Sequence, residues 1–444
     1  MAAEFSYHGD ALFCEHVPLD QIANEYGTPA YVYSKAAIRS RFHQYEDALA
    51  GLPHRVCYAV KANSNLAVLA TLAAEGAGFD IVSGGELYRV LAAGGDPSSV
   101  VFSGVGKTAA EIRYALEQNI HSFNCESETE IELISTIAAS SGQTACIAIR
   151  VNPDVDAVTH PYISTGLREH KFGIDIARAE EIYARVARLP GIEVNGVSCH
   201  IGSQLLSVEP LLEAADKVLA LVQRLRGAGL TIRDLDLGGG LGVPYRSEER
   251  RVPVDTFIQR LRGKLQDSNL TLMLEPGRSI VAEAGVLLSR VLLVKTNDDK
   301  TFVIVDAAMN DLIRPALYQA HHEILPARRV KGPVQPVKAD VVGPVCESGD
   351  FFARGRDLPP LAPGDLVAIK TAGAYGFVLA SNYNSRPRPC ELLVDGARIH
   401  VARRRETFPD LIRGESSATG AASGIKQTEC EHDQSPCDIC TGSS

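Results

Sequence analysis

Between residues 35 and 276, hydrophobic residues follow two kinds of pattern that alternate along the chain. The alternation predicts a sequence of strands and helices in turn. Short runs rich in β-branched and aromatic residues are followed by longer segments in which apolar residues recur every three or four positions. The predicted strands are 55–60, 79–82, 100–102, 121–124, 145–151, 194–199, 235–237 and 271–274. The predicted helices are 34–50, before the first strand, and then 66–75, 85–93, 109–118, 126–140, 179–189, 209–226 and 255–265.

Eight strands joined by helices in about 240 residues are typical of a (β/α)8 TIM barrel, an α/β fold of about 250 residues. The competing architecture is an open, doubly wound sheet. It is disfavoured because no dinucleotide-binding fingerprint follows the first predicted strand.

The pattern changes after Pro276, where short β-rich runs are separated by Gly, Pro and Asp. This pattern of short strands and turn residues predicts a C-terminal antiparallel β domain, to which the run 31–33 is expected to add an N-terminal strand. Its predicted strands are 286–295, 302–306, 334–342, 366–370, 391–394 and 398–402. The predicted division of the chain is an N-terminal segment joining the β domain (1–34), the barrel (35–276), the β domain (277–413) and a flexible cysteine-containing tail (414–444).

Composition and charge narrow the class of protein. Hydrophobic residues make up 45% and charged residues 22% of the 444 positions, as in a globular enzyme with a large core. The net charge is −10, and no stripe of basic residues is present to neutralise the phosphates of a nucleic acid, so we expect no nucleic-acid partner. No apolar window of 18 residues and no signal peptide is present, so we expect no membrane partner and a cytoplasmic location.

The ten cysteines fall into two groups. Seven show no paired spacing and are expected to be reduced thiols: Cys14, Cys57, Cys125, Cys146, Cys199, Cys346 and Cys390. The other three, Cys430, Cys437 and Cys440, form a C-x6-C-x2-C cluster near His432 that could bind a metal. Because the segment from Gly414 is rich in Ser, Gly and Thr without apolar periodicity, we favour a flexible tail and expect no metal.

Lys61 ends the apolar run 55–60, so its amine is expected to point from a packed strand into the space beyond it. Burial disfavours the charged amine and lowers its pKa. A neutral amine can attack a carbonyl and form a Schiff base, as the lysine of pyridoxal phosphate enzymes does. The alternative is a lysine whose amine merely extends into solvent. The residues at the ends of the other predicted strands must distinguish these two interpretations.

Chemically active side chains also follow the remaining predicted strands. A barrel enzyme places such groups at the C-terminal ends of its strands, which meet on one face. They are Asp80, Ser83, Ser103, Asn124, Arg150, His200, the glycines 238–240 and Glu275. Their convergence with Lys61 on one face predicts an active site there. For Asp80 and for the nearby Glu86, a structural capping role is the alternative.

Two glycine-containing loops after the last two strands predict an anion site. The backbone of Gly238–Gly240 and Gly242 can approach a phosphate closely because no Cβ intervenes, although a glycine run can also be a flexible turn. Gly277 and Arg278 end the next strand, which matches the usual phosphate position in barrels.

A flat, ring-shaped cofactor is also consistent with two side chains near these loops. Glu275 could keep a pyridine nitrogen protonated and so make the ring an electron sink, or it could pair with Arg278. His200 could stack on the ring or could be a satisfied core histidine.

Several segments together resemble the pyridoxal phosphate-dependent decarboxylases of the alanine racemase-like fold. These are Tyr-Ala-Val-Lys-Ala-Asn at 58–63, His-Ile-Gly-Ser-Gln at 200–204, the glycines at 238–242 and Glu-Pro-Gly-Arg-Ser at 275–279. The segments 150–154, 160–166, 171–173, 346–350 and 372–376 narrow the resemblance to the diaminopimelate decarboxylase family, over roughly residues 12 to 412. The resemblance implies a barrel with a β domain, pyridoxal 5′-phosphate as cofactor, and a head-to-tail homodimer whose active sites lie at the subunit boundary.

The resemblance also implies roles for individual residues. Lys61 is similar to the Schiff-base lysine, His200 to the residue stacked on the ring, and Cys346 to a catalytic residue supplied by the partner subunit. The implied cofactor-binding residues are Lys61, Asp80, His200, Ser203, Gly239, Gly240, Glu275, Gly277, Arg278 and Tyr375. The implied substrate-binding residues are Arg278, Arg314, Tyr318, Glu347 and Tyr375. Two departures are Cys199, where relatives often carry histidine, and the tail beyond Gly414.

The expected reaction is decarboxylation of meso-2,6-diaminopimelate to L-lysine and CO2, the last step of lysine biosynthesis. The small-molecule substrate carries a distal carboxylate and ammonium, for which Arg278, Arg314 and Glu347 have the required charges. The alternatives are a related decarboxylase acting on ornithine, arginine or carboxynorspermidine, a racemase of the same fold, and a regulator without catalysis. Glu275 argues against the racemase, and the presence of Lys61 and Cys346 argues against the regulator.

Overall fold

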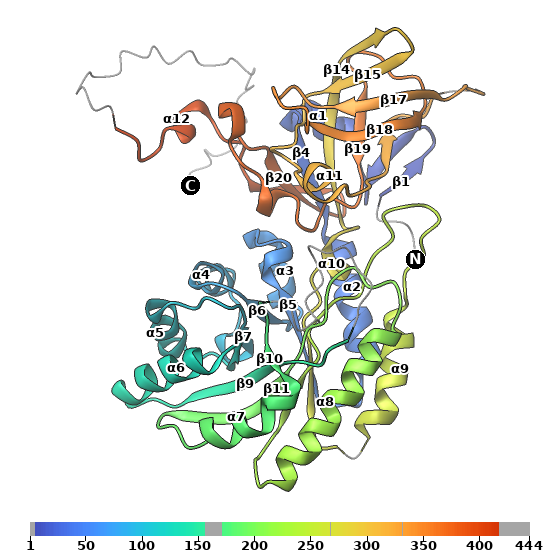
Figure 1. The fold of residues 1–444 in the computed structure, drawn as a ribbon. Coiled ribbons are helices and arrows are strands. Elements are labelled where there is room, and N and C mark those ends of the chain that lie inside the picture. The colour runs from blue at the N-terminus through green and yellow to red at the C-terminus, as the bar shows by residue number, and fades with distance from the viewer. Residues whose placement is uncertain (1–4, 156–170, 267, 331, 417–444) are drawn as a thin grey trace, which may run out of the picture.

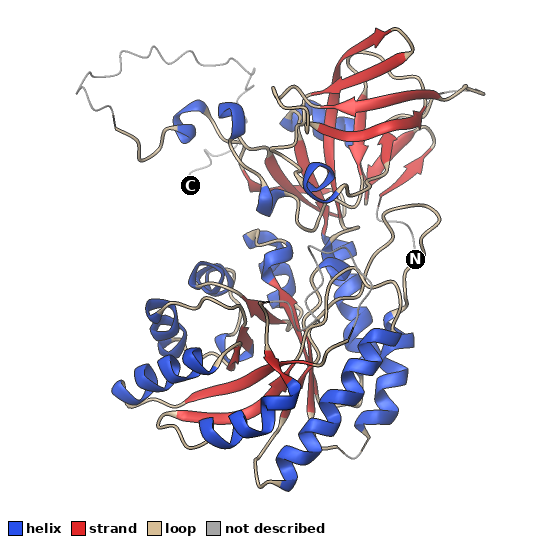
Figure 2. Ribbon diagram, viewed as in Figure 1, coloured by secondary structure: helices blue, strands red, loops and turns tan. Residues whose placement is uncertain are grey.

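A computed structural model describes residues 5–155, 171–266, 268–330 and 332–416. The chain forms a barrel surrounded by helices and a second body built almost entirely of strands (Figures 1 and 2). The C-terminal ends of the barrel strands face this second body, and the polypeptide crosses between the two more than once.

Eight parallel strands close the barrel. The hydrogen-bonded order is β9-β11-β12-β13-β5-β6-β7-β8, and an additional β8–β9 pairing completes the ring. The bounds are β5 His54–Ala59, β6 Gly78–Ile81, β7 Val100–Phe102, β8 Ser122–Cys125, β9 Ala145–Asn152, β11 Ile192–Ser198, β12 Asp234–Asp236 and β13 Thr271–Leu274. A two-residue strand, β10 (Ile174–Asp175), pairs in parallel with the end of β9. The predicted (β/α)8 barrel is confirmed, and the open doubly wound alternative is wrong because the β8–β9 pairing closes the eight strands into a ring.

Helices precede or follow the barrel strands in the predicted order. Five of them begin at a Ser, Thr or Asn whose side chain accepts a backbone hydrogen bond, which satisfies an otherwise unpaired N–H group. Glu86 accepts from the N–H of Val82 at 2.7 Å, in the structural capping role given as its alternative. The bounds are α2 Lys35–Leu49, α3 Leu66–Ala74, α4 Gly84–Ala92, α5 Ala109–Glu117, α6 Glu128–Ser140, α7 Ala179–Val186, α8 Glu209–Gly227 and α9 Val254–Leu265.

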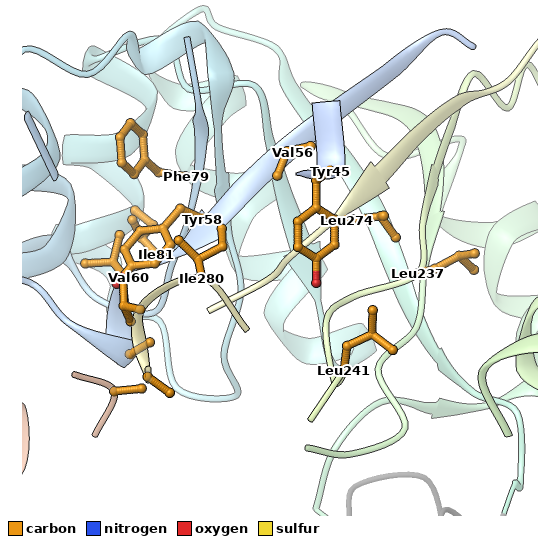
Figure 3. Close-up of a cluster of buried hydrophobic side chains, with 14 of the residues drawn as sticks. Tyr45, Val56, Tyr58, Val60, Phe79, Ile81, Leu237, Leu241, Leu274 and Ile280 are labelled. Atoms are coloured by element: carbon orange, nitrogen blue, oxygen red, sulfur yellow. The ribbon is translucent and has the colours of Figure 1, made fainter. Parts of the chain in front are cut away.

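A continuous apolar core holds the strand ends in place. Figure 3 shows Tyr58, Val60 and Ile280 packed together beside the end of β5, and all three are buried. Tyr45 of α2 is also buried, and its hydroxyl lies 2.7 Å from Ser279 Oγ in the short helix α10 (Arg278–Val281). This packing places the segment after β13 against α2, so the backbone around Arg278 has little freedom to move.

The second body is a nine-stranded sheet centred on β14 (Gly285–Asn297). Its main path is β18-β17-β15-β14-β4-β20-β21, with β19 bridging β14 and β16. Most pairings are antiparallel, as predicted, but β15 with β17 and β4 with β20 are parallel. The remaining bounds are β4 Ala30–Ser34, β15 Lys300–Val305, β16 Ile324–Pro326, β17 Val337–Val342, β18 Phe351–Leu358, β19 Leu366–Ile369, β20 Cys390–Asp395 and β21 Arg398–Arg403.

The N-terminal segment ties the two bodies together. Strand β4 lies between β14 and β20 and runs directly into α2 of the barrel. The N–H of Ser34 donates to Ala284 O at 2.8 Å, so the outgoing and returning chain segments are joined where they cross. Ahead of β4 lies a small sheet with one helix, which the sequence analysis did not predict: β1 Phe5–His8, β2 Ala11–Cys14, β3 Val17–Pro18 and α1 Leu19–Tyr26.

Two further short helices, α11 (Arg314–Tyr318) and α12 (Phe408–Leu411), belong to the second body. Across the described ranges, every helix is too short or too polar to cross a membrane.

Candidate active site

A cavity of about 390 Å³ lies where the C-terminal ends of the barrel strands face the second body. Ten of the predicted site residues line it: Lys61, His200, Ser203, Gly240, Glu275, Gly277, Arg278, Arg314, Tyr318 and Tyr375. Asp80 and Gly239 contact these lining residues from behind. Cys346 and Glu347 do not line the cavity.

Lys61 lies in a single turn of 3-10 helix directly after β5, and its amine donates to Asp80 Oδ2 at 2.7 Å. The exposed part of the Lys61 side chain, 39%, faces the cavity, and burial by the surrounding protein still acts to lower its pKa. The negative charges of Asp80 and Glu275 outweigh burial and raise the pKa of Lys61 above its ordinary value. The lowered pKa expected from burial alone is therefore wrong, because that reasoning left out the buried carboxylates.

Asp80 is fully buried at the end of β6. Its Oδ2 accepts from Lys61, whereas its Oδ1 has no hydrogen-bond partner among the described residues. A buried carboxylate oxygen without a donor is unfavourable unless a neighbouring positive charge compensates. Asp80 is thus an ion-pair partner of Lys61 rather than a structural cap.

Glu275, at the end of β13, belongs to a buried acidic network. Its Oε1 accepts from Asn124 Nδ2 at 3.1 Å and from Ser103 Oγ at 3.4 Å, and the same Asn124 amide donates to Asp236 Oδ2 at 2.8 Å. Burial, followed by the charges of Asp236 and Asp80, raises the pKa of Glu275 well above its ordinary value. Burial raises the pKa of Asp236 as well. The Glu275 carboxyl group therefore tends to hold a proton unless a cation lies against it.

Asp236 was not predicted as a site residue. It ends β12 two residues before the glycine run, and its Oδ1 accepts from the N–H of Gly238 at 2.8 Å. The position of a carboxylate at a barrel-strand end is the signal that could have identified it.

The glycine loop after β12 requires its glycines. A Cβ on Gly239 would lie 2.2 Å from Glu275 O, and one on Gly240 would lie 2.6 Å from Gly202 O. Gly240 also has a φ of +119°, which side chains other than that of glycine rarely adopt. Three loops thus meet at backbone contact distance, and Gly240 among them lines the cavity.

His200 lies on the cavity wall as a neutral ring. Burial, and then the positive charges of Arg150 and Lys61, lower its pKa well below the ordinary value. Its Nδ1 accepts from the N–H of Gly239 at 3.3 Å, so the proton of the neutral ring is on Nε2. A flat, uncharged imidazole in this position is suited to stacking on another ring.

Two buried guanidinium groups form the other end of the cavity. Arg278 and Arg314 are 7% and 6% exposed, and neither forms an ion pair with a carboxylate in the described part of the chain. Arg278 donates to Ser203 Oγ at 3.2 Å and to Tyr245 OH at 2.7 Å. Because buried charges are normally paired, these two cations predict an anionic ligand.

Tyr245 was also missed by the sequence analysis. It lines the cavity, and the guanidinium carbons of Arg314 and Arg278 lie 4.5 and 5.9 Å from its ring centroid. Burial by itself raises the pKa of Tyr245, but the two arginines lower it below its ordinary value. No local pattern distinguishes this tyrosine, because its partners come from distant segments.

Cys346 and Glu347 are exposed on the loop between β17 and β18. The N–H of Cys346 donates to Asn384 Oδ1 at 3.2 Å, which holds this loop against the segment 381–388. Within one chain, these two residues are therefore not brought to Lys61. The motif 160–166 and the cysteines Cys430, Cys437 and Cys440 lie outside the described residues.

Comparison with known proteins identifies relatives along nearly the whole chain. Residues 35–282 match the family described as pyridoxal-dependent decarboxylase, pyridoxal binding domain. The diaminopimelate decarboxylase of Pseudomonas aeruginosa is 59% identical over 412 residues, covering 93% of this chain and 98% of that protein.

Two solved structures show the same similarity. The diaminopimelate decarboxylase of Helicobacter pylori complexed with L-lysine is 46% identical, with a TM-score of 0.85 and coverage of 89% and 98%. That of M. jannaschii in co-complex with L-lysine is 37% identical, with a TM-score of 0.89 and coverage of 94% and 98%.

The close approach at Gly239 can be tested by substitution. Gly239→Ala should lower the free energy of unfolding by roughly 1–3 kcal/mol, because the added methyl group collides with the backbone of Glu275. Gly263→Ala is the matched control, since Gly263 is exposed in the last turn of α9 and a Cβ there meets nothing within 4 Å; it should raise stability by roughly 0.5–1 kcal/mol. Thermal unfolding followed by circular dichroism measures both. Equal behaviour of the two variants would contradict the crowded loop.

Proposed function

Because the chain belongs to the diaminopimelate decarboxylase family, we propose that the cavity at the barrel mouth is its active site and that Lys61 is the reactive amine. The enzyme decarboxylates meso-2,6-diaminopimelate to L-lysine and CO2 with pyridoxal 5′-phosphate as cofactor, in the last step of lysine biosynthesis. The relatives are 44–59% identical over almost the whole chain, which sets aside the ornithine, arginine and carboxynorspermidine alternatives.

The residues present fit this cofactor. Ser203 and Gly240 line the cavity where a phosphate would be held, and the glycines keep the loop there because a Cβ on Gly239 or Gly240 would collide with the backbone of Glu275 or Gly202. At the other side, a protonated pyridine nitrogen would supply the cation that the Glu275 carboxyl group lacks. When bound, pyridoxal phosphate supplies an electron-withdrawing ring that can take up the electron pair released with CO2.

Each chain residue then has a defined task. Lys61 presents its amine to the cofactor, and Asp80 orients that amine and compensates its charge. Glu275 would hold the ring nitrogen protonated, and Asn124 and Ser103 orient its carboxyl group. The neutral His200 would cover the ring and exclude water. Gly277 and Tyr375 complete the cofactor pocket.

The observation that carries the substrate assignment is the pair of buried arginines for which the described ranges contain no acidic partner. Arg278 and Arg314 would bind the carboxylate at the end of the substrate that does not react, with Tyr318 and Tyr375 beside them. Substrates such as lysine and ornithine have no second carboxylate, and they would leave these buried charges unpaired. The resulting discrimination favours a diamino diacid.

The remaining groups would come from a second copy of the chain. Cys346 and Glu347 are exposed and lie away from the cavity of their own chain. In a homodimer they would complete the partner's site, Cys346 as the proton donor to the decarboxylated carbon and Glu347 as the partner for the distal ammonium. An open site in one chain and an exposed reactive pair elsewhere on it support this sharing.

Two further proposals concern the location of the protein and the division of its chain. We propose a cytoplasmic location, which is supported by the free state of all seven cysteines in the described ranges. The proposed division remains 1–34, 35–276, 277–413 and 414–444, and it is supported by the start of α2 at Lys35 and by the return to the sheet at β14.

The activity itself has a direct test. Purified protein incubated with pyridoxal phosphate should convert meso-diaminopimelate into equimolar L-lysine and CO2. Lys61→Ala should reduce turnover by at least roughly a thousandfold, because no other lysine of the described ranges lines the cavity. Lys217→Ala, an exposed lysine on α8, should retain full activity. An active Lys61→Ala variant would refute the assigned amine.

Glu275→Gln tests the proton-holding role. The amide cannot accept the charge of a protonated ring nitrogen as a carboxylate does, so kcat should fall by roughly 10²–10³-fold. The variant should still bind pyridoxal phosphate, as judged from its absorbance, because the glycine loop and Lys61 are intact. A kcat equal to that of the wild type would exclude this role for Glu275.

Shared sites can be tested by mixing inactive variants. After Lys61→Ala and Cys346→Ala are unfolded and refolded together, about half of the dimers should be mixed, and each mixed dimer holds one intact site. Activity should recover to about a quarter of the wild-type value. Cys346→Ala mixed with Glu347→Gln is the control, because both residues would enter the same site and neither site is intact. Recovery in the control but not in the first mixture would argue against the proposed sharing.

A further inference from the structure

His322 lies beside the distal end of the cavity, just before β16, and is fully buried. Its Nδ1 is 2.7 Å from Lys370 O, and its Nε2 is 2.9 Å from Arg314 Nη1. The imidazole therefore links the backbone of the second body to one of the two arginines proposed to bind substrate.

These contacts determine the protonation of the ring. A carbonyl oxygen can only accept a hydrogen bond, so Nδ1 must carry a hydrogen. A guanidinium group can only donate, so Nε2 must present a lone pair to Arg314. Both bonds form in one state alone, the neutral ring with its proton on Nδ1. Burial, and then the charge of Arg314, agree with this, since they lower the pKa of His322 to about 3.

A neutral acceptor has a specific advantage at this position. A carboxylate bonded to Arg314 would orient it equally well, but it would also neutralise the charge and compete with an incoming anion. His322 occupies one N–H of the guanidinium group and, because it is neutral, leaves the positive charge for a ligand. Tyr245 does the same for Arg278, because its hydroxyl oxygen accepts from Nη1 at 2.7 Å.

We propose that His322 is a positioning residue that fixes the guanidinium group of Arg314 for the distal carboxylate of the substrate. It acts through Arg314 and does not touch the reacting atoms. The proposal rests on the substrate-binding role proposed above for Arg314. It predicts that His322 affects the affinity for ligands that carry the distal carboxylate and leaves the chemical step unchanged.

Two substitutions separate the two hydrogen bonds of the ring. The Asn side chain in His322→Asn places an amide near the position of Nδ1, so it can keep the bond to Lys370 O but offers nothing to Arg314. The longer side chain in His322→Gln reaches the position of Nε2, where its carbonyl oxygen can accept from Arg314. The pair differs by one methylene group and by which bond survives.

The ligands are chosen to isolate the distal carboxylate. The product L-lysine retains it, whereas 1,5-diaminopentane has the same carbon chain and amines without it. In His322→Asn, the inhibition constant for L-lysine and the KM for meso-diaminopimelate should each rise about tenfold or more. The kcat should change by less than about twofold, because lost binding alone raises KM. His322→Gln should stay within about threefold of the wild type, and 1,5-diaminopentane should bind all variants equally.

Arg314→Lys and two structural measurements complete the experiment. Arg314→Lys should weaken L-lysine binding in the same way, while the pyridoxal phosphate absorbance and the melting temperature of every variant should match the wild type. If Arg314→Lys weakens L-lysine binding and His322→Asn does not, the inference about His322 fails and the role of Arg314 stands. If Arg314→Lys has no effect, the substrate-binding role itself fails. If both His322 variants lose affinity for L-lysine and for 1,5-diaminopentane equally and melt at a lower temperature, His322 has only a structural role.

Discussion

The ion pair between the Lys61 amine and the Asp80 carboxylate, 2.7 Å apart, is the interaction on which the rest of the site depends. It brings together the ends of two neighbouring barrel strands, β5 and β6, at the mouth of the cavity. Among the described residues, Lys61 is the one lysine that lines this cavity, and the buried carboxyl groups of Asp80 and Glu275 act on it. Asn124 links Glu275 to a third buried carboxyl group, that of Asp236. An excess of buried negative charge is unfavourable by itself, so the site is suited to a ligand that brings positive charge to the Glu275 end.

The opposite end of the cavity has an excess of buried positive charge. Two buried guanidinium groups are held by neutral acceptors, the Tyr245 hydroxyl and the His322 ring, rather than by carboxylates. One cavity therefore contains an anionic end that suits a protonated ring and a cationic end that suits a carboxylate. This separation of charge explains how one small space can accept both a cofactor and a substrate that is charged at each end.

The two-body architecture makes this arrangement possible. The barrel provides Lys61, His200, the glycine loop and Glu275, whereas Arg314, Tyr318 and Tyr375 come from the second body. Strand β4 and the contact between Ser34 and Ala284 connect the bodies where the chain crosses. Under the proposed assignment, Arg314 of the second body would bind the distal carboxylate and the barrel would hold the reactive end, so the spacing of the two bodies would set the length of the substrate.

The barrel, the order of its helices and most of the candidate residues at its strand ends, Asp236 excepted, could be predicted from the chain alone. The eight strands were found because apolar spacing is a local property, and Lys61 and Glu275 because they directly follow those strands. The resemblance to known decarboxylases added Arg314, Cys346 and Glu347, which no local pattern distinguishes.

The tertiary structure decided the charge states and the supporting residues. Lys61 was expected to have a lowered pKa, and the carboxylates that raise it lie on other strands. Tyr245 and His322 were not predicted, because their partners are distant in sequence. Tyr245 accepts from Arg278. His322 lies between Arg314, eight positions before it, and the carbonyl of Lys370. Hydrophobic periodicity follows from neighbouring residues, whereas a pKa or a hydrogen-bond partner depends on groups that only folding brings within a few ångströms.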